Sequence, residues 1–600
     1  MNISFMLGNL IAQTPVPISS GPLLHIHAVD IVILLIYLLF VLAIGFITGK
    51  GHQTSEDFFL SGRSIPAWIT GLAFISANLG ALEVMGMATS GYQYGMMTAN
   101  FYWIAAIPAM IFMGVFMMPF YYGSKVRSVP EFLKKRYNEV ARFINAIFFA
   151  VFTPAVSGIS MYAMGLVFSD LLGWNFTASV ALSAVVVVVY TAMGGLTASI
   201  YNEVLQFFLI VLGTAPIVII GLIANGGGMN LWNDWHVFTQ KLTGMQLSPV
   251  PGGHVLSGAH YLTTWTGTGN TSDNTMQITW PGLVLGLGFV LAFSYWCTNF
   301  LVVQRTLAAK NMNDAQRTPL IAAIPKMLFP FVVILPGILA IPLIPGLLPG
   351  NAHMPGGVAV PAGMKIDNVL PLMMGKYFPA GMLGLGLTAL LASFMSGMAG
   401  NVTAFNTVFT YDLYAAYIRP NAPDKHYLNV GRIMTVVGVL ISVGFAYIAE
   451  GQSSIMGYTQ TIFGFVNAPL IAVFLLGMFT TFTTPWGGVF GLLFGTGAAV
   501  VHWILRTYTI HLGSASLHLT FNTDQAGNFW GAFWAFVYGA AAAIIVSLFT
   551  QKKPEKEMVG LVYQLTPKPE GEHLLPWWKK PVVLAVLVFL ATLILNILFW

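Results

Sequence analysis

The chain has 600 residues, of which 56% are hydrophobic and only 8% are charged. Soluble domains average about 25% charged residues, so this composition excludes a water-soluble enzyme or binding domain and predicts a membrane protein. The net charge of +5 requires no nucleic-acid partner, because basic loops beside anionic membrane lipid account for it. A single cysteine, Cys297, excludes an internal disulfide and a cysteine-based metal cluster.

Runs of about 20 apolar residues, each long enough to cross the hydrocarbon core as a helix, follow one another along the chain. We predict fourteen such spans and therefore an all-α polytopic membrane protein. In chain order they cover residues 29–49, 66–89, 101–122, 143–165, 173–193, 201–224, 282–304, 318–345, 379–409, 430–449, 457–480, 485–505, 529–550 and 581–600. Residues 1–30 lack a basic region before their apolar patch, so we expect no cleaved signal peptide.

The positions of the basic residues test this span count, because cytoplasmic loops carry an excess of Lys and Arg. Among the 25 Lys and Arg, only Lys241, Lys365, Lys376 and Arg506 fall on loops after even-numbered spans, and Lys326 lies within span 8. The other 20 fall on the side of the loops after odd-numbered spans, with Arg432 in the first turn of span 10. We therefore expect a multi-pass protein of the cell (inner) membrane with both termini outside.

The segments between spans indicate a single transmembrane domain over residues 1–600. Residues 225–280 form a long polar external loop, and residues 351–365 form a second external segment. Either could be a lid or a tether. Residues 551–580 carry mixed charge and several prolines, as expected of a cytoplasmic connector.

Spans 2 and 7 have the composition of interrupted helices. Span 2 passes through Ser76-Ala77-Asn78-Leu79-Gly80, and span 7 has three glycines before Tyr295-Trp296-Cys297-Thr298-Asn299. They lie five spans apart, and this odd offset makes them enter the bilayer from opposite sides. The glycines could serve helix packing alone, but their paired position favours an inverted five-helix repeat, residues 66–224 and 282–480, with a binding site near the midplane.

Charged side chains at bilayer depth cost several kcal/mol unless they are paired or wet, so each is a candidate site residue. Lys326 lies near the middle of span 8, where we expect it to bind solute or a carboxylate. Glu83, the only carboxylate of span 2, could contact solute hydroxyls, bind a cation, carry a proton or pair with Lys326. Glu203 and Asp412 lie near the cytoplasmic ends of spans 6 and 9, where structural or gating roles are expected.

Two further groups of residues suit a solute and a cation. Ser393, Ser396 and Gly397 share one face of span 9, where hydroxyl oxygens could bind a monovalent cation, although small residues also let helices pack closely. Aromatic residues flank both breaks and suit the apolar faces of sugars, or helix packing. The sequence contains no nucleotide-binding loop, zinc-ligand spacing or nucleophile motif, so we expect no enzyme.

Several short motifs carry a resemblance to a known family. They are Asp57 to Ser64, Ser76 to Leu79 with Gly86 and Met87, Val129 to Tyr137, Gly194 to Ala198, Gln304 to Lys310, and Phe409 to Tyr414. With them the chain resembles, from span 1 to span 14, the sodium:solute symporter family and its sodium/glucose and sodium/galactose branch. The resemblance implies a LeuT-like 5+5 inverted repeat with flanking helices, and cation-coupled import of a monosaccharide such as galactose or glucose by alternating access.

The resemblance also implies site residues. It places a Na⁺ site at the carbonyls of Ser76, Leu79 and Ser393, the hydroxyl of Ser396, and Gly397, which stands where the family has a further hydroxyl. The expected solute-binding residues are Asn78, Glu83, Met87, Phe101, Tyr102, Tyr295, Trp296, Asn299, Lys326 and Gln460. Within this set Glu83 replaces a family glutamine and Tyr102 a family glutamate, and Ala292 stands at a family asparagine position. Proton coupling through Glu83, and a non-transporting sugar sensor, are the alternatives.

Overall fold

The computed structural model describes residues 26–49, 55–228, 230–249, 254–265, 267, 273–348, 364–452, 454–512, 515–566 and 576–600. The expectation of no signal peptide falls almost wholly outside the described residues. So does nearly all of the external segment 351–365. The external loop 225–280 and the connector 551–580 are described in part.

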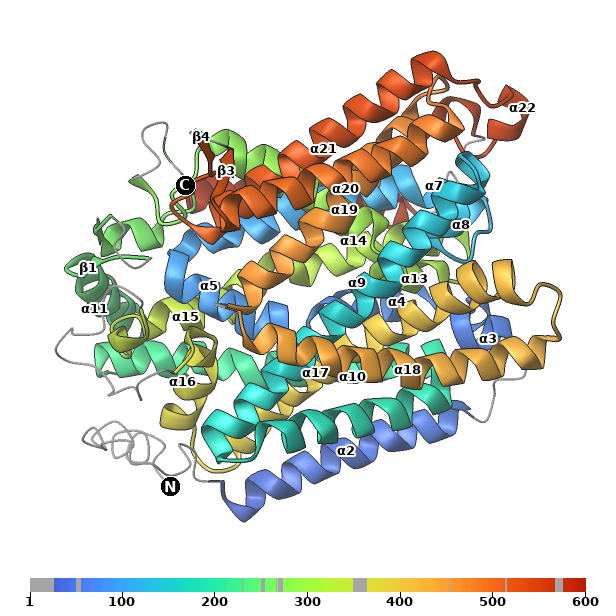
Figure 1. The fold of residues 1–600 in the computed structure, drawn as a ribbon. Coiled ribbons are helices and arrows are strands. Elements are labelled where there is room, and N and C mark those ends of the chain that lie inside the picture. Colours follow the sequence, from blue (N-terminus) through green and yellow to red (C-terminus); the bar gives the residue numbers. More distant parts are fainter. Residues whose placement is uncertain are drawn as a thin grey trace.

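Long helices form a single bundle, and the predicted spans are helical in the residues that the structure describes (Figure 1). The long helices are α2 (Ala28–Gly49), α9 (Glu139–Leu166), α10 (Phe176–Gly226), α14 (Met312–Phe329), α17 (Met382–Val408), α18 (Asp424–Glu450), α19 (Ile455–Phe479), α20 (Pro485–Thr507), α21 (Asp524–Phe549) and α23 (Pro581–Leu598). The shorter helices are α3 (Ser55–Leu60), α4 (Ala67–Asn78), α5 (Met87–Tyr94), α6 (Ile107–Phe112), α7 (Met118–Gly123), α8 (Val129–Arg136), α11 (Leu231–Thr243), α12 (Ala292–Thr298), α13 (Phe300–Leu307), α15 (Leu335–Ala340), α16 (Val369–Tyr377) and α22 (Glu555–Met558).

In the part of the chain that the structure describes, eleven helices are long and apolar enough to cross a membrane, and two bent pairs raise the number to thirteen. Predicted spans 5 and 6 both lie in α10, which is kinked at Gly195 (φ 53°). Its first part contains the shorter apolar helix Phe176–Val189. A side chain at Gly195 would approach the Phe58 carbonyl oxygen within 2.6 Å, so glycine is required at this turn. The count of fourteen spans stays a prediction.

Burial separates the central helices from the lipid-facing ones. Almost every residue of α17 is buried, whereas α21 and α23 expose large apolar side chains such as Phe549 and Leu598. Exposed apolar residues on such long helices are expected where the surrounding solvent is lipid.

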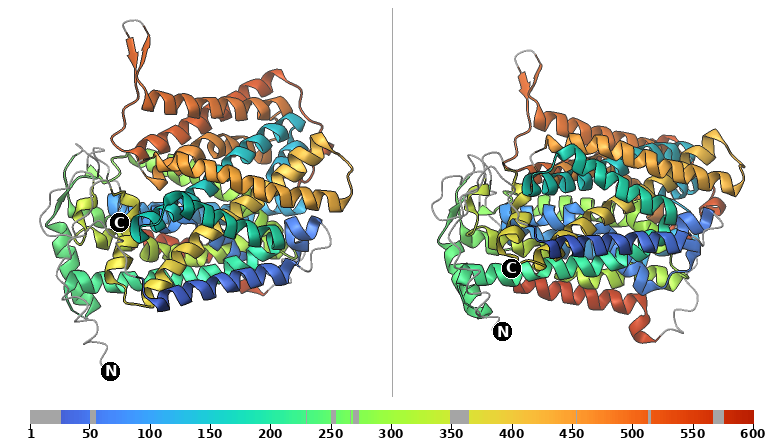
Figure 2. Two further views of the ribbon diagram at one scale, coloured as in Figure 1. Left: turned by 60° about the horizontal axis from the view of Figure 1, so that its bottom comes forward. Right: turned by 90° about the horizontal axis from the view of Figure 1, so that it is seen from below.

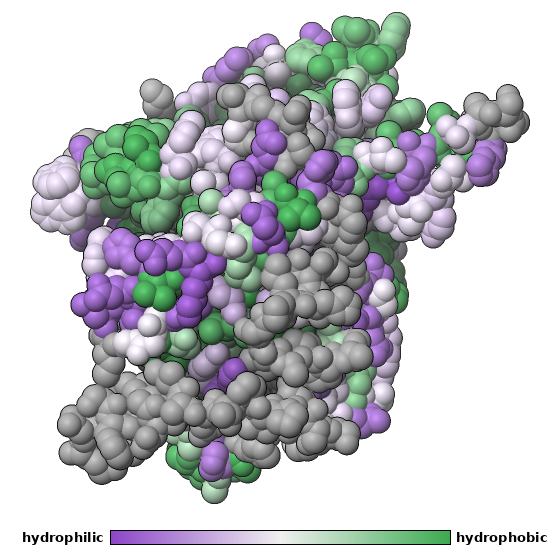
Figure 3. Space-filling view, turned by 90° about the vertical axis from the view of Figure 1, so that its left-hand side faces the viewer, coloured by the Kyte–Doolittle hydropathy of each residue, from purple (hydrophilic) through white to green (hydrophobic). Residues whose placement is uncertain are grey.

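The two ends of the bundle differ. Helices α3, α8 and α22 lie at one end, which we call the basic end because α8 and its neighbours carry the clustered lysines and arginines (Figure 1). Helix α11 and two small hairpins lie at the other end, the hairpin end (Figures 1 and 2). The hairpins are β1 (Gln246–Leu247) with β2 (Leu256–Ser257), and β3 (Ile510–Leu512) with β4 (Ala515–Leu517). Hydrophilic residues are spread over the hairpin end, with apolar ones among them (Figure 3).

Helix α2 begins and α23 ends at the hairpin end. Asp30, near the start of α2, accepts hydrogen bonds from the backbone N–H groups of Gly381 and Gly384, each 2.7 Å long. The hydroxyl of Thr264, in the loop at the hairpin end, donates to the carbonyl of Phe599 at 2.6 Å. The start of α2 and the end of α23 thus both lie at the hairpin end of the described bundle (Figure 1).

Both predicted breaks are confirmed. Helix α4 ends at Asn78, and the following helical segment Leu82–Ala99 is bent from it by 66°. The segment Gly282–Thr298 is bent by 47° from α13, with Asn299 between them. The Asn299 side chain accepts a 3.0 Å hydrogen bond from the backbone N–H of Leu301 and so caps α13. The division into inverted repeats over residues 66–224 and 282–480 stays a prediction.

Candidate functional site

A cavity with an empty volume of about 460 Å³ lies between the two broken segments. It is lined by Asn78, Leu82, Glu83, Met87, Phe101, Ala105, Ala106, Leu287, Leu291, Ala292, Tyr295, Trp296, Lys326, Gln460 and Phe463. Most of the predicted solute-binding residues therefore meet in one place, although they come from five separate stretches of the sequence.

Charged and polar groups are connected across this cavity. The Lys326 ammonium lies 2.9 Å from Glu83 Oε1 and donates to Asn78 Oδ1 at 2.5 Å. The Asn78 amide donates in turn to the Tyr295 hydroxyl at 3.0 Å. The Tyr102 hydroxyl donates to the second oxygen of Glu83. Lys326 and Glu83 are both buried, so each charge depends on this network for its stabilisation.

Local helix geometry aims these side chains at the cavity. Glu83 lies in a π-helical turn, Leu82–Gly86, directly after the first break, and Tyr102 lies in another, Phe101–Ala106. Such turns insert an extra residue and are frequent at functional sites. They rotate the carboxylate of Glu83 and the phenol of Tyr102 toward each other.

Aromatic rings form the apolar walls. Tyr295 stacks on Phe463 with ring centroids 5.1 Å apart, and Trp296 stacks on Phe74 at 5.5 Å. The Lys326 ammonium lies 4.4 Å from the Tyr102 ring centroid and 5.2 Å from that of Trp296. These cation–π contacts add to the stabilisation of a cation that has left water.

Two predicted solute-binding residues do not line the cavity. Tyr102 lies behind Glu83 and orients it, and the Asn299 side chain is used as the cap of α13. The structure also adds Phe463, Leu82, Leu287 and Leu291, which the sequence analysis did not single out. Nothing in their local sequence distinguishes them from ordinary apolar residues of a span.

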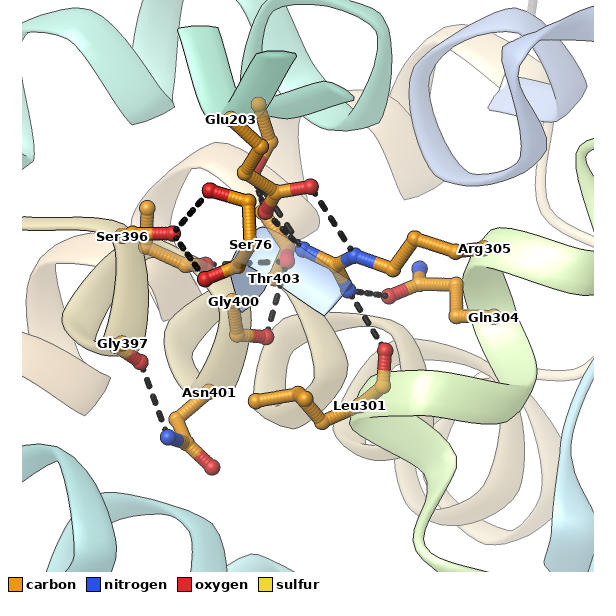
Figure 4. Close-up of polar contacts among 12 residues, drawn as sticks. Ser76, Glu203, Leu301, Gln304, Arg305, Ser396, Gly397, Gly400, Asn401 and Thr403 are labelled. Carbon is orange, nitrogen blue, oxygen red and sulfur yellow. Dashed lines mark hydrogen bonds and ion pairs between the residues drawn. The ribbon is translucent and has the colours of Figure 1, made fainter. Parts of the chain in front are cut away.

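Ser76, Ser396 and Gly397, three of the residues predicted to bind Na⁺, lie where α4 ends against α17 (Figure 4). The Ser396 hydroxyl donates to the Ser76 carbonyl at 2.8 Å, and the two hydroxyl oxygens are 3.5 Å apart. Leu79 is outside helical geometry, with ψ 42°, and the Ser393 hydroxyl is buried without a partner among the described residues. Uncharged oxygens from two elements suit a hard monovalent cation, so the residues present fit Na⁺.

Gly397 has a packing role that the sequence did not reveal. A side chain at Gly397 would place its Cβ 3.0 Å from the Gly80 Cα and 3.0 Å from the Ser160 hydroxyl oxygen. The two glycines thus allow α17 to contact the break in the first span directly. Ser160, on α9, brings a hydroxyl next to the position where the resemblance expects a side-chain ligand.

Comparisons with known proteins agree with this architecture. The profile of the sodium:solute symporter family matches residues 58–495. The chain is 31% identical to a sodium/glucose cotransporter of Vibrio parahaemolyticus, over 78% of this chain and 83% of that protein. It is 28% identical to sodium/glucose cotransporter 4 of Mus musculus, over 91% of this chain and 79% of the relative.

A solved structure shares the fold. The substrate-bound, outward-open structure of a Na⁺-coupled sialic acid symporter superposes with a TM-score of 0.69 at 20% identity, over 88% of this chain and 99% of the other. The chain belongs to the sodium:solute symporter family and is a sodium-coupled solute symporter of the membrane.

Proposed function

We propose that the solute is a neutral monosaccharide, with galactose and glucose as the first candidates, and that it binds in the cavity between the two breaks. The observation that carries this proposal is the network of Lys326, Glu83, Asn78 and Tyr295 inside an aromatic-walled cavity. An ammonium, a carboxylate, an amide and a phenol offer both donors and acceptors to the hydroxyl groups of a sugar.

The charge of the cavity favours a neutral solute. Lys326 and Glu83 neutralise each other at 2.9 Å, so a solute with a net charge would leave one buried charge unbalanced. Sugars also present an apolar ring face, which the stacked rings of Tyr295 and Trp296 can cover. The relatives of similar sequence are sodium/glucose cotransporters, which supports the same class.

The pattern of hydroxyl recognition differs from that expected for the sugar branch. Glu83 accepts where a glutamine could also donate, and Tyr102 holds Glu83 from behind. Ala292 lines the cavity where the resemblance expects an asparagine. Unsatisfied buried polar groups reject a ligand strongly, so these three positions decide which sugar is accepted.

Sodium is proposed to bind between α4 and α17, at the carbonyls of Ser76, Leu79 and Ser393 and the hydroxyl of Ser396. For this the Ser396 hydroxyl has to turn its hydrogen away from the Ser76 carbonyl, so that both oxygens face the ion. Moving one charge down a membrane potential of about 100 mV supplies roughly 2.3 kcal/mol, enough for about fifty-fold accumulation.

Alternating access then follows from the position of the cavity between two inverted five-helix repeats, residues 66–224 and 282–480. Tyr295, bonded to Asn78 and stacked on Phe463, closes the path from the cavity toward the basic end. The basic end faces the cytoplasm of the cell (inner) membrane, and both termini lie outside. Lipid contacts the exposed apolar faces of the outer helices. The chain crosses the membrane fourteen times.

Uptake into proteoliposomes with independent control of sodium and pH tests the proposal. We expect an inward Na⁺ gradient to drive radiolabelled D-galactose or D-glucose above its external concentration, and a proton gradient without sodium to have no such effect. Accumulation would also exclude a sensor or a passive channel on the same scaffold. Binding without accumulation of either sugar under a Na⁺ gradient would refute the proposed function.

A further inference from the structure

A second buried ion pair lies between the cavity and the basic end. Arg305 of α13 contacts Glu203 of α10, and both side chains are excluded from solvent, at 0% and 1% exposure. Arg305 lies six residues after Asn299, the break of the second segment, which is roughly 9 Å along a helix. Neither the cavity nor the proposed sodium ligands use this pair.

Oxygen atoms surround the Arg305 guanidinium. Both oxygens of Glu203 accept from it, one of them at 3.2 Å from Nε. The Leu301 carbonyl accepts at 2.8 Å, and the hydroxyl of Ser199 and the amide oxygen of Gln304 lie at 3.3 and 3.4 Å. Ser199 also donates to Glu203 at 2.8 Å. A fully hydrogen-bonded pair of this kind holds its two helices in one relative position.

The pair joins elements that belong to different parts of the bundle. Glu203 and Ser199 lie in the part of α10 that follows the Gly195 kink, whereas Arg305 lies on the short helix beyond the second break. A side chain at Gly400 of α17 would come within 3.1 Å of Leu301 and 3.3 Å of Arg305, so glycine lets α13 seat against α17. Figure 4 shows the guanidinium at this junction, held by Glu203 and Leu301.

Helix α13 directly follows the break at Asn299, so it continues the second broken segment away from the cavity. In the described structure the side chains of Arg305, Glu203 and Gln304 are all buried, so the bundle is closely packed around the ion pair. Separating a buried pair without water leaves two unpaired charges, which is strongly unfavourable. Separation therefore becomes accessible only when this end opens and admits water.

We propose that Glu203 and Arg305 form the inner latch of the transporter, the contact that keeps the basic end closed and that breaks when the cavity opens toward it. The latch rests on the proposed alternating access. In this proposal Glu203 and Arg305 both hold α13 in position and control the opening of the basic end. Loss of either charge removes the stabilisation of the closed form and admits water toward Ser76 and Ser396.

The test measures access to the sodium-site region from the basic end and requires no solute. Because Cys297 is the only cysteine, a Cys297→Ala background with Ser76→Cys provides a single reporter thiol in an otherwise buried position. Inside-out vesicles are treated with a membrane-impermeant thiosulfonate reagent, and the rate of modification is followed. Adding Glu203→Gln should raise this rate at least about tenfold, since the closed form loses its charge pairing.

Three further variants complete the test. Arg305→Lys keeps the positive charge but loses the forked guanidinium geometry, so it should raise the modification rate by a smaller factor. If Glu203→Gln does not fold, Arg305→Lys still tests the proposal. The double variant Glu203→Arg with Arg305→Glu exchanges the two charges and keeps the pair. Its modification rate should return toward that of the reporter protein with the native pair. Asp412→Asn disrupts a comparable buried pair, Arg142 with Asp412 at 2.8 Å, and should lower thermal stability without changing the rate.

A folded Glu203→Gln or Arg305→Lys protein that is modified no faster than the reporter would overturn the latch. A faster rate in Asp412→Asn as well would reduce the pair to a general structural role. Failure of the wild-type protein to accumulate sugar would contradict the proposed function instead, and it would leave these modification rates unaffected.

Discussion

The Lys326–Glu83 pair allows one prediction to be worked out quantitatively. The ammonium and the carboxylate are 2.9 Å apart, with side-chain exposures of 1% and 6%. Replacing Lys326 by Met leaves the Glu83 carboxylate buried beside Tyr102 without a counter-charge. Removing one partner of a buried pair costs about 3–5 kcal/mol, so Lys326→Met should markedly lower the unfolding temperature and abolish the response to sugar.

A double variant separates the ion pair from the individual residues. Replacing a buried pair by uncharged groups of similar volume is often nearly neutral, so Lys326→Met with Glu83→Gln should recover most of the stability lost in Lys326→Met. Sugar binding should remain absent in the double variant, because the donors and acceptors of the cavity are changed. Lys376→Met, at an exposed lysine, is the control and should alter neither property.

Thermal unfolding of the purified proteins, with and without D-galactose and Na⁺, measures both effects. A double variant as unstable as Lys326→Met would show that the carboxylate of Glu83 is not the source of the penalty. Retention of the sugar-dependent stabilisation in Lys326→Met would remove Lys326 from the site.

Three other predictions concern single positions. Tyr102→Phe removes the hydroxyl that donates to Glu83 and should raise the KM of sodium-driven sugar uptake by about five- to thirty-fold, since an unmade buried hydrogen bond costs about 1–2 kcal/mol; an unchanged KM would mean that Tyr102 does not orient Glu83. Gly397→Ser should lower the unfolding temperature, at a cost of about 1–3 kcal/mol from overpacking against Gly80, and sodium titrations should show no gain in affinity. Asp367, in the short helical turn Ile366–Asn368 before α16, has its pKa raised to about 6 by burial, although the backbone N–H of Ile455 donates to it and opposes this shift. Because the folded protein holds this proton more tightly than the unfolded chain, stability should fall as pH rises from about 4 through 6, and Asp367→Asn should flatten that part of the profile in thermal unfolding.

Much of the fold could be predicted from residue order. Apolar runs require lipid as solvent, and a backbone in lipid has to satisfy its own hydrogen bonds, so each run becomes a helix. Positive charges segregate to alternate loops, which predicted the two ends of the bundle. The interruptions at Ser76 to Gly80 and before Asn299 were also visible, because glycine and polar residues within a span disfavour a continuous helix.

Other features required the three-dimensional structure. The sequence shows Lys326 and Glu83 at bilayer depth, but only packing decides that they pair with each other and that Asn78 and Tyr102 complete their hydrogen bonds. Asn299 resembles a ligand in sequence, yet its backbone geometry makes it a helix cap. Phe463 lines the cavity with no local signal at all.

What the sequence determines by itself is the solvent, the order of the helices and the positions where two of them are interrupted, because these follow from local composition and from the cost of unpaired backbone groups. Tertiary structure decides which distant side chains meet, since contacts such as Lys326 with Glu83 and Arg305 with Glu203 join residues far apart in the chain. Such pairing depends on helix rotation and on close approach at glycines, neither of which is encoded in any single segment.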